Sequence, residues 1–115
     1  MTISGGSSGQ DGSAGSAGSA SCAAPGTLIG TCTSARYSVA ECAEYYTGLD
    51  YTVHSIVQAC MPLNGSDSSL ACGVAGTLGC CVSASKHTRT CYFGAPTLRP
   101  GLIAACKQNN DAFCQ

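Results

Sequence analysis

The chain has 115 residues, a formal net charge of −1 and only 10% charged residues. A nearly neutral chain lacks the positive field that attracts nucleic acid or an anionic membrane surface, so we expect no nucleic-acid partner. No run approaches the roughly 18 apolar residues that span a bilayer, which predicts no membrane insertion.

The amino-terminal segment MTISGGSSGQDGSAGSAGSAS, residues 1–21, is almost entirely small or polar. It has too little apolar surface to offset the entropy lost on ordering, so we expect a disordered Gly/Ser/Ala linker. Residues 22–115 are predicted to form one cysteine-rich, disulfide-stapled domain, because a domain of this size often needs covalent support.

All the cysteines lie in this second part. An even number at such density predicts five disulfides in an oxidising compartment, and hence a secreted or cell-surface protein. Met1 is not followed by a charged and apolar leader, so an export signal would have been removed, replaced or missed. No Cys-x2-Cys spacing marks a zinc site, and we expect neither metal nor cofactor. The ten residues are Cys22, Cys32, Cys42, Cys60, Cys72, Cys80, Cys81, Cys91, Cys106 and Cys114.

The first predicted element is a helix over residues 35–46. Apolar side chains recur there at i, i+3, i+4 and i+7 from Val39, which is the spacing of one helical face. Thr33 or Ser34 can cap it, and Gly48 can end it.

A second helix is predicted from Tyr51 to Met61. The same spacing returns from Val53, Asp50 can serve as its cap, and Pro62 stops it.

From Gly79 to Tyr92 the pattern changes to alternation, with a polar Ser-Lys-His-Thr group between two short runs, which predicts a β-hairpin. A third helix should start at Thr97 or Arg99 with Pro100 in its first turn. The predicted fold is therefore α+β: a small disulfide-rich domain with about three short helices and a β-hairpin.

Two segments of the chain are weakly similar to each other. Val57 to Cys72 and Ile103 to Cys114 each run from a helix end through Ala-Cys and a polar turn to a second cysteine. This suggests two local disulfides, Cys60 to Cys72 and Cys106 to Cys114. Adjacent strand residues point to opposite faces, so Cys80 and Cys81 should have different partners. The candidate partners are Cys32, Cys42 and Cys91.

Several short motifs resemble cysteine-rich repeats found behind Gly/Ser/Ala linkers in bacterial lipoproteins and other exported proteins. They are Glu44-Tyr45-Tyr46-Thr47-Gly48, the Ala-Cys loop ending in Cys72, Gly76-Thr77-Leu78-Gly79-Cys80, Cys91-Tyr92-Phe93, and the closing Ala-Cys loop. The resemblance covers most of Cys32 to Cys114. It implies an exported domain and no particular activity.

The segment GCCVSASKHTRTCY, Gly79 to Tyr92, is similar to the catalytic helix of secreted phospholipases A2. That chemistry needs a histidine beside a calcium-binding aspartate, whereas His87 is followed by Thr88 and lies in a predicted hairpin. His54 has no nucleophile motif near it and is interpreted as a partly exposed helix residue. We therefore expect no catalytic residues.

Two surface features are candidates for binding. Lys86, His87 and Arg89 should lie near the hairpin tip, where they could contact an acidic group or simply be a solvated turn. The five tyrosines, Tyr37, Tyr45, Tyr46, Tyr51 and Tyr92, could contact carbohydrate or protein, or fill a core that has no tryptophan.

These features favour a monomeric, non-catalytic exported or cell-surface domain with a structural or binding role. Its partner would be a protein or a surface ligand. The alternative is a small secreted toxin or inhibitor acting through a disulfide-fixed loop.

Overall fold

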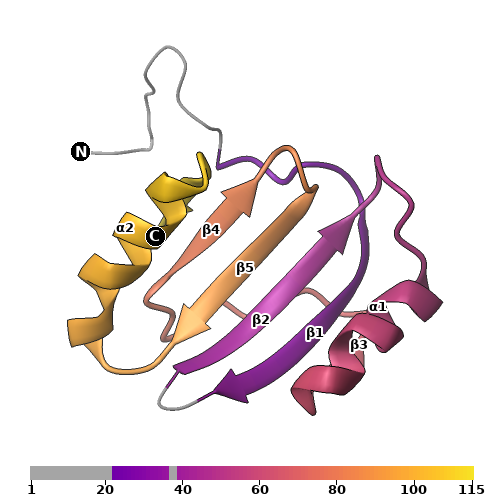
Figure 1. Ribbon diagram of the computed structural model, residues 1–115, viewed down its shortest axis with the longest axis horizontal. Coiled ribbons are helices and arrows are strands. Elements are labelled where there is room, and N and C mark those ends of the chain that lie inside the picture. Colours follow the sequence, from indigo (N-terminus) through magenta and orange to yellow (C-terminus); the bar gives the residue numbers. More distant parts are fainter. Residues whose placement is uncertain (1–21, 37–38) are drawn as a thin grey trace.

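The computed structural model describes residues 22–36 and 39–115, so the predicted linker and Tyr37 lie outside the described residues. The domain is built on one six-stranded antiparallel sheet in the order β3-β1-β2-β5-β4-β6, with two short α-helices (Figure 1). The strands are β1 (Leu28–Arg36), β2 (Val39–Tyr46), β3 (Ser66–Ser68), β4 (Gly79–Ser83), β5 (Thr88–Phe93) and β6 (Ala112–Cys114). The helices are α1 (Val53–Cys60) and α2 (Arg99–Gln108), with 3-10 turns η1 (Met61–Leu63) and η2 (Pro96–Leu98).

The predicted fold class is wrong, because a sheet dominates and the helix expected over 35–46 does not exist. Most of that segment is β2, which pairs with both β1 and β5. Its buried residues alternate with a period of two: Cys42, Glu44 and Tyr46. The alternation is hidden in the sequence because one of the three buried positions holds a charged residue, and pattern reading assigns charge to the surface.

The other two predicted helices are present. Thr52, rather than Asp50, caps α1, through a reciprocal pair of hydrogen bonds with Ser55. The second helix, α2, carries Pro100 in its first turn, where a missing N–H breaks no helical bond. None of the helices in the described part of the chain is long and apolar enough to cross a membrane.

The predicted hairpin is also present, as strands β4 and β5. Ser83 lies opposite Thr88 at its closed end, and Cys80 lies opposite Cys91. His87 precedes β5 with a φ of +53°, a left-handed conformation that ends the turn.

The two helices lie on one face of the sheet. Cys32, Ala43, Thr90 and Cys81 are direct neighbours across four strands, so their side chains point to the same side. Cys32 is bonded to Cys60 at the end of α1, and Cys81 is bonded to Cys106 in α2. We call this side the helix face. In Figure 1, α1 and α2 flank the sheet, and β2 and β5 lie between them.

The opposite side, the loop face, is covered by the segment that joins β3 to β4. Cys42, Cys91, Cys80 and Cys114 form one row across it. Cys42 is bonded to Cys72 in the covering segment. The other two disulfides on this side are Cys80–Cys91 and Cys22–Cys114.

All ten cysteines are paired, and Cys80 and Cys81 have different partners, as the alternation of a strand predicts. The partner of Cys80, Cys91, is one of the three predicted candidates, whereas the partner of Cys81, Cys106, is not. The two predicted local disulfides are wrong. Cys60 and Cys106 are bonded on the helix face, whereas Cys72 and Cys114 are bonded on the loop face. The sheet itself separates the members of each expected pair. Five disulfides in a domain of this size indicate an oxidising, extracellular environment.

Candidate functional site

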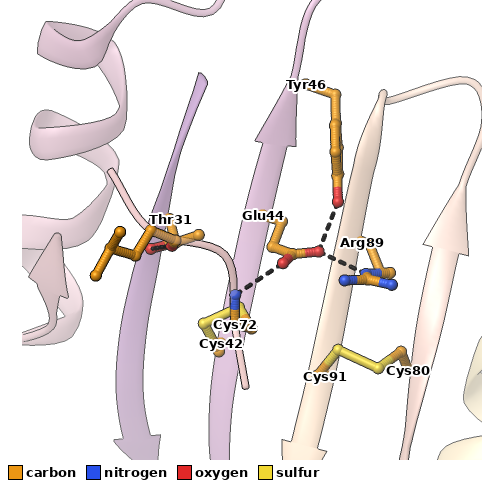
Figure 2. Close-up of polar contacts among 9 residues, drawn as sticks. Thr31, Cys42, Glu44, Tyr46, Cys72, Cys80, Arg89 and Cys91 are labelled. Atoms are coloured by element: carbon orange, nitrogen blue, oxygen red, sulfur yellow. Dashed lines mark hydrogen bonds and ion pairs between the residues drawn. A yellow bond between two sulfur atoms is a disulfide. The ribbon is translucent and has the colours of Figure 1, made fainter. Parts of the chain in front are cut away.

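Glu44 is completely buried at the centre of the loop face, with 0% of its surface exposed. Its carboxylate accepts hydrogen bonds from the Tyr46 hydroxyl at 2.6 Å, from the Cys72 backbone N–H at 2.8 Å and from Nε of Arg89. Figure 2 shows these three donors converging on the carboxylate from β2, the covering segment and β5. Both carboxylate oxygens therefore have hydrogen-bond partners within the fold, so the buried group supports the structure.

Burial and hydrogen bonding together determine the pKa values of this cluster. Burial raises the pKa of Glu44, but the bonds from Arg89, Tyr46 and Cys72 together outweigh it, so the pKa lies below 4.5. Burial and the bond to Glu44 raise the pKa of Tyr46 to about 12. The bond to Glu44 also raises the pKa of Arg89. At neutral pH the cluster is therefore a carboxylate, a guanidinium and a neutral phenol.

A pH dependence of stability follows from the lowered pKa of Glu44. The stabilisation should be fully present above pH 4.5, the ordinary value for this carboxyl, and be lost as the pH falls through the lower native pKa. Urea unfolding followed from neutral to strongly acidic pH measures this loss. In the variant Glu44→Gln the slope in that window should be smaller. Parallel curves for the two proteins would contradict the assignment.

The three predicted tip residues do not form one exposed cluster. Arg89 points into the loop face and is bound to Glu44. His87 is half-buried; its Nδ1 lies 2.9 Å from the Thr47 carbonyl oxygen, and its ring occupies the space above Gly48. Lys86 is exposed, and within the described residues its ammonium has no ion pair.

The hairpin turn is fixed to the segment that follows β2. The Tyr46 N–H donates to the His87 carbonyl at 2.9 Å, and the Tyr51 hydroxyl donates to the Lys86 carbonyl at 2.8 Å. Lys86 is therefore presented by an anchored backbone. A binding role for these residues stays a prediction.

On the two central strands, β2 and β5, the helix face is more accessible than the loop face. The side chains that these two strands place on the helix face are all half-buried. On the loop face, by contrast, Cys42, Glu44, Tyr46 and Cys91 are buried. Neither helix covers the two central strands. The positions are Glu41, Ala43 and Tyr45 on β2 and Thr88, Thr90 and Tyr92 on β5.

Three of the tyrosines that the structure describes lie on or beside this face. The rings of Tyr45 and Tyr51 meet edge to face with centroids 5.0 Å apart. Burial, followed by Tyr51 and Glu41, raises the pKa of Tyr45. Burial, followed by the charges of Glu41 and Asp111, raises the pKa of Tyr92. Tyr46, by contrast, is in the core on the other side, so the tyrosines divide between core filling and surface presentation.

A cavity of about 190 Å³ lies between α2 and the β4–β5 hairpin on the helix face. The Cys81–Cys106 disulfide forms part of its wall. Two of the other lining residues, Leu102 and Ala105, are apolar. The rest carry polar groups: Ser83, Lys86, Thr88, Thr90, Tyr92, Asn109 and Asp111.

Cys81, Cys106 and Asp111 are close enough together to hold a metal ion. Both sulfurs are consumed by the disulfide, however, so no thiolate is available there in the oxidised protein. His54 is exposed on α1. Among the described residues, neither histidine forms an ion pair with a carboxylate.

Comparisons with known proteins give no similar protein: no family model, curated protein or solved structure matches this chain significantly.

Sequence reasoning did not find Glu44, Asn109 or Asp111 as parts of these sites. The alternation of Cys42, Glu44 and Tyr46 along β2 predicts that Glu44 is buried, if a charged residue is accepted at a buried position. Asn109 and Asp111 carry no local signal, because their loop is brought to the hairpin by two contacts between distant parts of the chain, the Cys81–Cys106 disulfide and the pairing of β6 with β4.

Proposed function

We propose that this protein is a non-catalytic exported binding domain that contacts its ligand through the helix face of β2 and β5. The observation that carries the proposal is the accessibility of this face, framed by two helices that are each bonded to the sheet by a disulfide. A rigid face loses little conformational entropy on binding. Tyrosines on such a face supply broad contact area with a polar tip.

The absence of catalytic chemistry is part of this proposal. The carboxylate of Glu44 is fully buried, both of its oxygens accept hydrogen bonds within the fold, and Arg89 neutralises its charge. Secretion or display at a cell surface fits the disulfides, and the likeness of the sequence to repeats of exported proteins is consistent with it. A reactive-loop inhibitor is the second candidate, favoured by the exposed Leu70 and Val74 beside the bonded Cys72.

The test uses the oxidised domain, fluorescently labelled, on an array that carries extracellular polysaccharides and secreted proteins. We expect retention on at least one probe, and loss of that retention in Ala43→Arg, which places a long charged side chain in the middle of the helix face. The matched control is Ala59→Arg, an exposed position of α1. Thermal unfolding verifies that both variants are folded.

Three results would contradict the proposal: retention unchanged by Ala43→Arg, no retention on any probe, or turnover of ester, peptide or glycoside substrates by the purified domain. Stoichiometric inhibition of a protease, reduced by substitution of Leu70 and unaffected by Ala43→Arg, would favour the inhibitor instead.

A further inference from the structure

The cavity beside α2 is lined mostly by polar side chains. Thr88 and Thr90 present hydroxyls, Asn109 presents an amide and Asp111 presents a carboxylate. Within the described part of the chain, the side chains of Thr88, Thr90 and Asn109 form no hydrogen bond with protein groups. The cavity thus offers donors and acceptors that the fold itself does not use.

Charge around the cavity is balanced. Lys86 carries a positive group and Asp111 a negative one, and neither forms an ion pair with another described residue. An anion would be attracted by one and repelled by the other, so the cavity does not select for ligand charge. A neutral ligand rich in hydroxyl groups matches both side chains, because an ammonium donates and a carboxylate accepts.

Tyr92 adds an aromatic wall to this polar lining. An aromatic ring packs well against the C–H groups of a ligand whose edges carry hydroxyls. At about 190 Å³ the cavity is smaller than the roughly 300–1,000 Å³ of sites for drug-sized molecules, so it fits one ring-sized unit.

We propose that the cavity between α2 and the β4–β5 hairpin binds one neutral sugar residue, with Tyr92 against its C–H face and Asn109 and Asp111 bonded to its hydroxyls. This inference rests on the proposed binding function and names its ligand class as a glycan. Thr88, Thr90 and Tyr92 belong to both the cavity and the helix face, so a glycan chain can continue over β5 and β2. The Cys81–Cys106 disulfide holds the two walls in place, which limits the entropy lost on binding.

The experiment is an NMR titration of the oxidised domain with methyl glycosides of glucose, galactose, mannose and N-acetylglucosamine. For at least one glycoside we expect saturable shifts confined to the amides of 83–92 and 105–111, with a dissociation constant in the millimolar range. Asn109→Ala and Asp111→Asn should each weaken binding about tenfold or more. The control is Asp67→Asn, which alters a carboxylate at a separate cavity beside α1 and should leave the titration unchanged.

No saturable shift with any glycoside, or equal binding by Asp111→Asn, would overturn the proposal. Tighter binding of methyl glucuronide than of the neutral glucoside would overturn the neutral ligand class. Ala43 lies outside the cavity, which separates this test from that of the binding function. If glycosides fail while array retention on a protein still depends on Ala43, the sugar site is wrong and the binding face stands.

Discussion

Replacing Glu44 by alanine should lower the free energy of unfolding by about 3–5 kcal/mol, because the substitution leaves the partly buried Arg89 guanidinium without its counter-charge. It also removes the acceptor of the Tyr46 hydroxyl and of the Cys72 N–H. Arg89→Ala should have an effect of the same order, since it leaves a carboxylate with 0% exposure without its cation. Urea denaturation at neutral pH measures both.

Glu41→Ala provides the control on the same strand. Glu41 is half-buried and forms no ion pair among the described residues, so its replacement should change stability by about 0.5 kcal/mol or less. The double variant Glu44→Ala with Arg89→Ala should be clearly more stable than the sum of the single effects predicts, because no charge is left unpaired. Strictly additive effects would show that the pair does not act as a unit.

Removing the Cys42–Cys72 disulfide by two serine substitutions should destabilise the domain by about 3–4 kcal/mol. The cysteines are 30 residues apart in sequence, and a loop of this length sets the entropy that the bond removes from the unfolded chain. The loss should also loosen the segment over the loop face, since Cys72 contributes both a disulfide and the N–H bonded to Glu44. Urea denaturation gives the energy, and limited proteolysis should find new cleavage between residues 70 and 78.

Mass spectrometry must first show that the other four disulfides are intact in this variant. The alanine pair at the same positions separates loss of the cross-link from burial of two hydroxyls; the two variants should differ by much less than either differs from the parent. Unchanged stability together with unchanged protease resistance would mean that the covering segment is held by its other contacts.

The sequence predicted the correct elements where apolar residues are buried and polar residues are exposed. The α1 and α2 helices and the β4–β5 hairpin follow from amphipathic spacing, turn residues and Pro100. Strands β1 and β2 were not predicted because polar residues occupy buried positions in both: Thr31 is 2% exposed and Glu44 is 0% exposed. Each is satisfied by a partner distant in sequence, so the burial becomes evident only once the sheet is assembled.

The disulfides could likewise be predicted only in part. That Cys80 and Cys81 have different partners follows from the sequence, because it depends only on the alternation of side chains along one strand. The bonds of Cys60 and Cys106 depend on which face each helix occupies, and that choice is made by the whole sheet. The candidate sugar site depends on the same assembly, since its two walls are joined through the Cys81–Cys106 disulfide and the pairing of β6 with β4.

Cys60 and Cys72 are bonded on opposite faces of the sheet, and this also affects whether another chain can pair with the edge of the sheet. The chain between them must pass round the outer edge of the sheet, where β3 pairs with only three residues of β1. Both ends of that passage are covalently fixed, so the edge cannot peel away while the two disulfides remain. An edge strand that is short and strapped in this way is a poor template for another chain to extend. The same cross-links that stabilise the domain therefore also hinder the pairing of this edge with another chain.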